Sequence, residues 1–389
     1  MGSRTRWWRS AVATGTIVAV TAVGTAPPAG AATIEVTTTA DGGAGSLRDA
    51  FAQASVAVEP TDIVLGDGAS YVLDDCGEGD LDHLGTQPLT ITGGGSTITQ
   101  TCAGERVIES DGDLTVTDAT ITGGTLALGI GGGIEADTDD VTLVRSTVTG
   151  NSGPIGGGVA AIRVTTVAST VADNTAGSTG GGIWADQVAD LTNSTVAGNT
   201  AGTGGGGITV VNTSVNLLHA TVAGNTAPIG ANIELQAGSD DLSSFASVVA
   251  EPEGGGTDCA VDPGATTISH GYNVSSDSSC GFGGVPGDVD GGVAVDLGPL
   301  ADAGGPTPTR VPLASSFLID LVECGYGPVD VTVDQRGVVR AQGTACDVGA
   351  VEVEVVDPVD PTDPTDPIDP GPGSAPPAVP IAGPADFTG

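Results

Sequence analysis

The pattern Ser194-Thr195-Val196-Ala197-Gly198-Asn199, followed by Gly205-Gly206-Gly207-Ile208, recurs along the middle of the chain. Its other copies start at Thr120, Ser146, Ser169 and Ala220. The apolar residue after each glycine run recurs at steps of 25, 24, 25 and 25 residues, at Ile134, Val159, Ile183, Ile208 and Ile233. Self-similarity at a period of roughly 20–50 residues is typical of a solenoid, in which each repeat packs against its neighbours.

Each repeat has the chemistry of short strands joined by turns. β-Branched stretches such as Ile208-Thr209-Val210-Val211 suit a pleated sheet, and the Gly, Asn and Asp residues between them favour turns. No apolar stripe with the helical period occurs between Thr86 and Ala250, which argues against helical or leucine-rich repeats. A coil of roughly 25 residues with three short strands predicts an all-β fold, a right-handed parallel β-helix.

Stacked coils lie about 4.8 Å apart, so equivalent residues form ladders along the solenoid. One expected ladder is aliphatic and internal: Val148, Val171, Val196 and Val222. A second set shares another register position: Asn151, Asn174, Asn199 and Asn225. These asparagines form either a polar binding stripe or an internal ladder whose amides satisfy turn backbone and one another. We favour the internal ladder.

The N-terminus has the order of an export signal. Arg4, Arg6 and Arg9 precede an apolar run over 11–23 and the small-residue site Ala29-Gly30-Ala31. This order predicts a signal peptide over residues 1–31, cleaved after Ala31. No later apolar run is long enough to span a bilayer, so we expect a mature chain without a transmembrane segment, secreted or held at the cell surface.

The expected export of the chain indicates how its six cysteines are used. An oxidising compartment and an even count favour disulfides, although six cysteines allow 15 connectivities. The cysteines fall into three local pairs, which we expect to be bonded: Cys76–Cys102, Cys259–Cys280 and Cys324–Cys346. No C-x-x-C spacing occurs, and His83, His219 and His270 stand apart in the sequence, so we assign no metal ligands.

The charge balance excludes several partners. The 389 residues contain 48 acids against 10 arginines and no lysine, a formal charge of −38. Removal of the signal peptide leaves 7 arginines, and 7 minus 48 is −41. Such a chain repels nucleic acid and anionic membranes, because it cannot neutralise phosphates. Its acids could gather cations diffusely, calcium among them, and we assign no cofactor.

The ends of the solenoid differ from its middle. Ser46 and Asp49 resemble a capping box at the start of a helix whose buried face would be Leu47, Ala50, Phe51 and Ala54. Asp-Pro-x triplets after Asp357 predict a stiff solvated spacer, or less plausibly a calcium-binding tail. We divide the chain into a signal peptide (1–31), cap and first coils (32–85), regular repeats (86–250), C-terminal coils with a disulfide-bearing cap (251–354) and a tail (355–389).

Two segments resemble known exported proteins. Gly45-Ser46-Leu47-Arg48-Asp49-Ala50-Phe51 is similar to the N-terminal signature written CSLREA, with Gly45 in place of the cysteine. Asp334-Gln335-Arg336-Gly337 and Cys346-Asp347-Val348-Gly349-Ala350-Val351-Glu352 resemble choice-of-anchor Q proteins. The repeats also look like those of adhesin-like polymorphic outer-membrane proteins. The resemblance implies an exported β-helix of the pectin-lyase-like type with a variable attachment sequence and no defined reaction.

Parallel β-helices also carry polysaccharide lyases and glycosidases, which need paired acids or a base. The adjacent pairs Asp139-Asp140 and Asp240-Asp241 lie four coils apart, roughly 19 Å, and cannot act together. An acid site would more plausibly use Asp288, Asp290 and Asp296, which we interpret as loop or calcium ligands. We therefore assign no catalytic residue and expect a non-catalytic display protein for adhesion or glycan contact, with a cell-wall or extracellular glycan or a neighbouring surface as partner. The alternative is a carbohydrate-active enzyme of the β-helix type.

Overall fold

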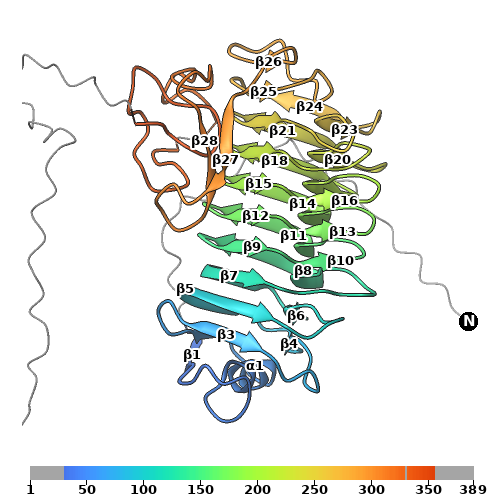
Figure 1. Cartoon of the computed structure of the whole chain (residues 1–389), viewed down its shortest axis with the longest axis vertical. Helices are drawn as coiled ribbons and strands as arrows, with labels where there is room; N and C mark the ends of the chain where they lie inside the picture. Colours follow the sequence, from blue (N-terminus) through green and yellow to red (C-terminus); the bar gives the residue numbers. More distant parts are fainter. Residues whose placement is uncertain (1–29, 329–330, 355–389) are drawn as a thin grey trace, which may run out of the picture. The chain divides into compact units, whose positions relative to one another are not determined.

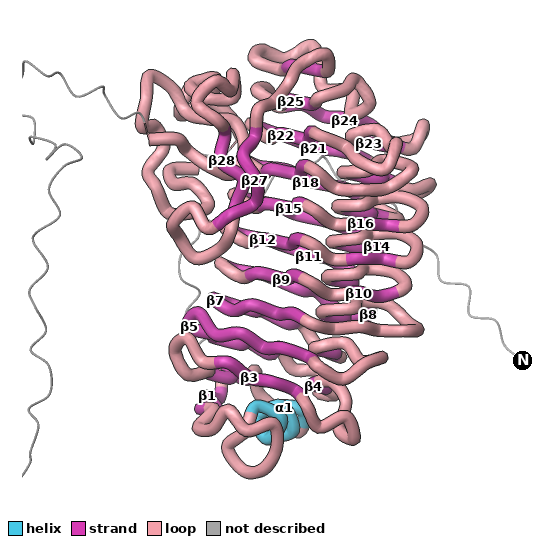
Figure 2. Tube along the Cα trace, viewed as in Figure 1, coloured by secondary structure: helices cyan, strands magenta, loops and turns pink. Residues whose placement is uncertain are grey.

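The computed structural model describes residues 30–328 and 331–354 of the chain. The predicted signal peptide, apart from its last two residues, and the predicted tail lie outside the described residues. The described part consists of parallel strands wound into stacked coils, with a single helix at the N-terminal end (Figures 1 and 2). The predicted β-helix is therefore confirmed by the pairing of the strands themselves.

Each central coil contributes strands in the same order. The first strands are β4 (Leu81–His83), β6 (Ile108–Ser110), β17 (Ile208–Val210), β20 (Ile233–Leu235) and β23 (Cys259–Val261). The second strands are β1 (Ala32–Glu35), β2 (Thr61–Val64), β18 (Ser214–Leu218), β21 (Asp241–Phe245) and β24 (Thr266–Ser269). First and second strands are continuous in β8 (Ile134–Val144), β11 (Val159–Val167) and β14 (Ile183–Thr192).

The third strands are β3 (Ser70–Leu73), β9 (Thr147–Thr149), β12 (Thr170–Ala172), β15 (Thr195–Ala197), β19 (Thr221–Ala223), β22 (Val248–Ala250), β25 (Val274–Ser275) and β26 (Val289–Asp290). Second and third strands are continuous in β5 (Leu89–Gln100) and β7 (Leu114–Thr122). Short fourth strands follow in three coils: β10 (Ser152–Gly153), β13 (Thr175–Ala176) and β16 (Thr200–Ala201).

The register of the coils places like residues on like residues. The residue after each glycine run pairs with its equivalent in the next coil from Ile134 to Ile233. Val148, Val171, Val196 and Val222 form a continuous column in the same way. Both columns are fully buried, because their side chains point into the coil. β-Branched residues therefore fill these two columns of the core.

The glycine runs are turns pressed against the next coil. Gly180 has φ +67°, a left-handed conformation that glycine adopts without steric cost. A Cβ atom on Gly157 would lie 2.4 Å from the carbonyl oxygen of Thr175 in the neighbouring coil. The repeated glycines are thus required by the close approach of successive turns.

The four aligned asparagines are buried inside the turns. In Asn151, Asn174 and Asn199, the backbone N–H and the side-chain amide both donate to Oδ1 of the next asparagine, at 3.0 Å each. Asn225 continues this chain of hydrogen bonds to Asn232, whose amide donates to Asp258 at 2.9 Å. Their amides are therefore occupied by one another and by backbone groups rather than presented to solvent.

Helix α1 (Leu47–Ser55) packs on the first coils at the N-terminal end (Figure 2). Its buried residues are Leu47, Ala50, Phe51 and Ala54. The N-cap Ser46 side chain accepts from the Asp49 N–H at 3.2 Å, and the Asp49 carboxylate accepts from the Gly45 N–H at 2.7 Å. Aspartate thus performs the reciprocal capping that glutamate usually provides, one residue further upstream.

The C-terminal part leaves the coils and folds back along them. We call residues 293–328 and 331–353 the brace; it contains the antiparallel pair β27 (Leu297–Ala301) and β28 (Thr309–Pro312), which runs beside the third strands (Figure 1). Gln335 is the centre of this contact and is 1% exposed. Its side-chain amide donates to Thr170 Oγ1 at 2.9 Å, and its Oε1 accepts from Thr195 Oγ1 at 2.7 Å.

Three disulfides join Cys76 to Cys102, Cys259 to Cys280 and Cys324 to Cys346, the pairs expected from the sequence. The Cα atoms of the first pair are 5.3 Å apart, a usual distance for a disulfide. This bridge joins two neighbouring coils. The third pair lies within the brace and links its two halves.

Candidate functional site

One outward-facing column of the β-helix combines an aromatic residue with several acids. We call it the Trp184 column; it follows the first strands, one residue per coil: Asp82, Glu109, Glu135, Ala160, Trp184, Thr209, Glu234 and Ala260. Neighbouring members are about 4.8 Å apart along the axis. The column alternates with buried residues such as Ile183 and Ala185, so its side chains point away from the core.

Trp184 stands at the middle of this column. It is partly exposed, whereas Ala160 below it and Thr209 above it are fully buried. A Cβ atom on Gly180 would lie 2.7 Å from the Trp184 Cβ, so a glycine turn runs directly beside the tryptophan. Because Ala160 and Thr209 are small and the turn at Gly180 has no side chain, the indole of Trp184 is the most prominent apolar group of the column.

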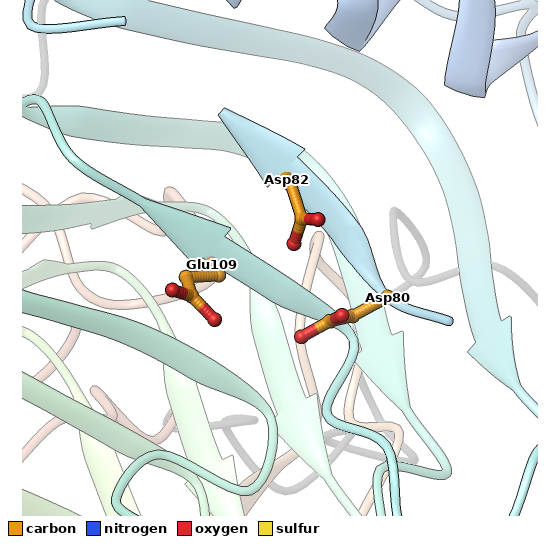
Figure 3. Close-up of side chains that lie close together, drawn as sticks. All are labelled: Asp80, Asp82 and Glu109. Carbon is orange, nitrogen blue, oxygen red and sulfur yellow. The ribbon is translucent and has the colours of Figure 1, made fainter. Parts of the chain in front are cut away.

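Carboxylates gather at the N-terminal end of the column. Asp80, Asp82 and Glu109 each offer an oxygen within 4.8 Å of the others (Figure 3). Within residues 30–328 and 331–354 this is the one group of three or more potential metal ligands so placed. Arg106 pairs with Glu109 at 2.6 Å, approaches Asp80 at 3.6 Å and also contacts Glu135.

The charges of this acid group influence one another. Burial, together with the nearby charges of Asp80 and Glu109, raises the pKa of Asp82 from 3.8 to about 6, and Arg106 opposes this effect. Asp82 therefore holds a proton more readily than an ordinary aspartate. Such a group can act as a proton donor, and the three carboxyl oxygens are of the type that hard cations prefer.

Glu234 lies on the other side of Trp184, two coils further along the column. Its carboxylate accepts from Thr209 Oγ1 and from the Gln236 amide, both at 3.2 Å. It also lies against the turn at Gly204, where a Cβ atom would be 2.6 Å from the carboxyl carbon. These contacts direct Glu234 back toward the coil of Trp184, so acidic groups stand on both sides of the tryptophan.

The acids that the sequence analysis considered lie elsewhere. Asp140 pairs with Arg163 at 3.7 Å, and the Asp240-Asp241 pair belongs to a different coil. Asp288 accepts from Ser269, Asp290 accepts from Ser275, and Asp296 lies 3.5 Å from the Ser315 hydroxyl. None of these aspartates belongs to the acid group, and the expectation that an acid site would lie after residue 250 stays a prediction.

The sequence contained a signal for the acid group that we did not use. Asp82, Glu109 and Glu135 follow one another at 27 and 26 residues, close to the coil period. Asp82 and Glu109 precede the first copy of the repeat, which starts at Thr120, so the glycine-run pattern does not align them. The three histidines remain apart: His83 contacts the Gln87 carbonyl at 2.9 Å, and His270 contacts the Ser243 hydroxyl at 3.2 Å.

The motif residues of the resemblance build the brace. The buried Asp334 carboxylate pairs with Arg336 and accepts from the Glu352 N–H at 2.9 Å. Arg340, also buried, pairs with Glu352 at 3.3 Å and donates to the Asn193 side chain at 3.0 Å. Arg340 therefore links the brace to the coils, the other contacts lie within the brace, and none of these residues belongs to the Trp184 column.

No family model and no curated protein sequence matches the chain. A solved structure described as the crystal structure of pectate lyase Pel9A aligns over 83% of this chain and 95% of its own, with 14% identity and a TM-score of 0.34. The chain is thus a parallel β-helix protein on the strength of its own strand pairings. In the described residues, no helix has the length and apolarity needed to cross a membrane.

Proposed function

We propose that this chain is an exported, non-catalytic β-helix that binds a linear glycan along the Trp184 column. The observation that carries the proposal is the partly exposed Trp184, set in an outward column with carboxylates on both sides. An indole presents a flat apolar face that packs against the C–H face of a sugar ring. Carboxylates and amides beside it accept hydrogen bonds from sugar hydroxyls.

The repeat of the fold supports a linear ligand. Successive members of the column are about 4.8 Å apart, close to the length of one pyranose residue in an extended chain. A polysaccharide lying along the axis would therefore meet a new coil with each sugar. Glu109 lies three coils from Trp184 and Glu234 two coils on the other side, so an oligosaccharide could contact all three.

The charge of the surface favours one class of glycan. The described column has four acids, and Arg106 pairs with two of them, Glu109 and Glu135. A polyanionic chain would bring its own carboxylates or sulfates against these acids and be repelled. The ligand we propose is a neutral or amine-bearing polysaccharide.

Tryptophan fluorescence tests the proposal directly. Trp7 and Trp8 precede the predicted cleavage site, so the mature chain has one tryptophan, Trp184. Titration with soluble neutral polysaccharides and with chitosan oligomers should change its emission in a saturable way. Co-sedimentation with insoluble glycans should be lost in Trp184→Ala and kept in Leu313→Ala, which removes an apolar side chain 49% exposed on the brace. Equal binding by both variants would refute the assignment.

A carbohydrate-active enzyme is the second candidate, and the acid group is the observation that favours it. Asp82, with its pKa raised to about 6, stands beside Glu109, whose carboxylate pairs with Arg106. Carboxyl groups about 5 Å apart are the arrangement of retaining glycosidases. Release of reducing ends from any polysaccharide, lost in Asp82→Asn and in Glu109→Gln but not in Trp184→Ala, would establish this activity over simple binding.

Export and display at the cell surface complete the proposal. Three disulfides and an even cysteine count with no free thiol support an oxidising location. We infer that the chain reaches its glycan outside the cell and is held there by a segment beyond the brace, as the choice-of-anchor resemblance implies. Secretion from the producing cell with a new N-terminus at Ala32, found by peptide mapping, tests the export step.

A further inference from the structure

A pocket of about 210 Å³ lies where the brace crosses the ends of the third strands (Figure 1). We call it the Arg310 pocket: its floor is formed by the turns at Gly198 and Gly224, and its side wall by β27 and β28, which carries Arg310. The volume is below the roughly 300 Å³ at which pockets for drug-sized ligands begin. None of its lining residues belongs to the first strands, so the pocket is separate from the Trp184 column.

The floor and both ends of the pocket come from one register position, the residue directly after each third strand. In four successive coils this position is Asp173, Gly198, Gly224 and Glu251. All four have a left-handed backbone, with φ between +55° and +71°. Glycine adopts this conformation without steric cost, and residues with a side chain adopt it rarely. The two glycines leave a gap in the column, and the acids on either side close its ends.

Asp173 closes one end of the pocket with a carboxylate that has no partner. The residue is exposed, and its side chain forms no hydrogen bond or ion pair with any described residue. Partial burial raises the pKa of Asp173, and no positive group offsets the effect. A Cβ atom on Gly198 would lie 2.4 Å from Oδ1 of Asp173, so the carboxylate lies over the floor of the pocket. It is therefore an accessible and unused acceptor.

Arg310 is held in place by two of its three nitrogens. Its Nε donates to the Gly298 carbonyl at 2.8 Å, and its Nη2 pairs with Glu251 at 2.7 Å. The third nitrogen, Nη1, lies over the floor, since a Cβ atom on Gly224 would be 3.0 Å from it. Nη1 has no acceptor among the described residues and is not one of the enclosed polar atoms, so it keeps accessible surface on the pocket. It is an unused donor.

The unused acceptor and the unused donor lie above neighbouring coils. The carboxylate of Asp173 lies over Gly198 and the guanidinium of Arg310 over Gly224, and these glycines are one coil apart, about 4.8 Å. Arg310 forms its ion pair with Glu251 and not with Asp173. A ligand with a donor and an acceptor on adjacent atoms can therefore bridge the two groups.

The charge of the pocket restricts the class of ligand. Glu251 and Glu253 also line it, so three carboxylates face one guanidinium, and an anionic ligand would be repelled. A single metal ion is disfavoured by spacing. Within residues 30–328 and 331–354, the acid group at Asp82 is the one set of three ligand oxygens within 4.8 Å of one another. The pocket therefore favours an organic cation that also carries a neutral acceptor.

We propose that the Arg310 pocket binds a hexosamine with a free amino group, either as the free sugar or at the end of a glycan. The ammonium donates to the Asp173 carboxylate, and the hydroxyl on the neighbouring carbon accepts from Nη1 of Arg310. The C–H groups of the ring contact Pro299 and Leu300 of the side wall. The ring holds the amine and the hydroxyl at a fixed separation, so little conformational freedom is lost on binding.

Isothermal titration of the secreted chain with D-glucosamine at physiological ionic strength tests the site, and saturable binding to one site is expected. N-acetyl-D-glucosamine lacks the positive charge and methylammonium lacks the hydroxyl. Each should bind about tenfold more weakly, because each loses one charge-assisted hydrogen bond. Chitosan oligomers, titrated into Trp184→Ala so that the glycan column does not contribute, identify the source of the sugar. Tighter binding than that of glucosamine assigns the pocket to the end of a glycan, and weaker binding assigns it to the free sugar.

Asp173→Gly is the decisive variant, because the coils on both sides have glycine at this position, Gly150 and Gly198. Glycine suits the φ of +55°, so the variant should keep the fold, as measured by its melting temperature, and bind glucosamine at least about tenfold more weakly. Glu59→Gln removes an exposed acid before β2 and controls for net charge; it should bind as the wild type does. Wild-type binding by Asp173→Gly, equal binding of glucosamine and methylammonium, or no saturable binding of glucosamine would overturn the proposal.

Discussion

Replacement of Asn199 by alanine should destabilise the protein through the asparagine ladder. Asn199 is fully buried, and its Oδ1 accepts from the backbone N–H and the side-chain amide of Asn174, both at 3.0 Å. Its own amide donates to the Val171 carbonyl at 2.9 Å and to Asn225 Oδ1 at 3.0 Å. Alanine removes all four contacts and leaves the Asn174 N–H without its acceptor.

The size of this effect can be worked from the contacts. A buried donor left unpaired costs about 1–3 kcal/mol, and each further lost bond about 1 kcal/mol. We expect a total loss of about 4–6 kcal/mol, equivalent to a fall in melting temperature of about 6–10 °C for a chain of this size. Circular dichroism during heating measures it, and glycan binding at low temperature should be unchanged because the ladder is internal.

Thr203→Ala is the matched control for this experiment. Thr203 is exposed in the same coil, so its replacement should change the stability by no more than about 0.5 kcal/mol. Equal melting temperatures for Asn199→Ala and Thr203→Ala would refute the structural role of the ladder. A variant at Asn199 that stays stable but loses glycan binding would mean that the asparagines are a binding stripe.

Three further predictions concern the turns, the brace and pH. Gly157→Ala should lower the melting temperature by several degrees, because its Cβ would lie 2.4 Å from the Thr175 carbonyl oxygen; wild-type stability would contradict the packing of the glycine turns. Gln335→Ala should destabilise the chain by about 3 kcal/mol, because its buried hydrogen bonds are lost. Replacement of the exposed Gln342 by alanine should leave the stability unchanged. Equal unfolding curves of the two variants in denaturant would argue against the brace contact. Burial raises the pKa of Asp82, Asp258 and Asp347 from 3.8 to about 6, so the folded chain binds protons that the unfolded chain releases between these values. Stability should therefore fall as pH rises from about 4 to 6, with a higher melting temperature at pH 5 than at pH 7.5, and an increase over this range would refute the pKa directions.

The sequence predicts those parts of the structure that repeat. The 25-residue step and the β-branched stretches indicate a β-helix, because each coil packs against its neighbours in the same way and so needs similar residues at equivalent positions. The aligned asparagines and valines could be located for the same reason, since their register follows from the step. The disulfides could be paired from local spacing, with Cys76 and Cys102 one coil apart.

The functional surface and the brace could not be predicted in this way. Trp184 shares its column with Ala160, Thr209 and Glu234, so no common residue type marks the register position. The brace joins residues far apart in the sequence, as in the contact between Gln335 and Thr170, and its segments have no period. Burial of Gln335 and Arg340 depends on that return of the chain, which residue patterns alone do not reveal.

The course of the brace has a consequence for how the protein resists force. Coils of a solenoid contact only adjacent coils, so pulling on one end would ordinarily peel them away one at a time. The brace, however, hydrogen-bonds to Ala168 through Thr307, to Thr221 through Ala350 and to Ala246 through Gly349. A tension applied at the C-terminus is therefore carried in parallel by several coils, and rupture requires their bonds to shear together. In a protein that is tethered at one end and binds a partner along its face, this arrangement would raise the force needed to unfold the coils.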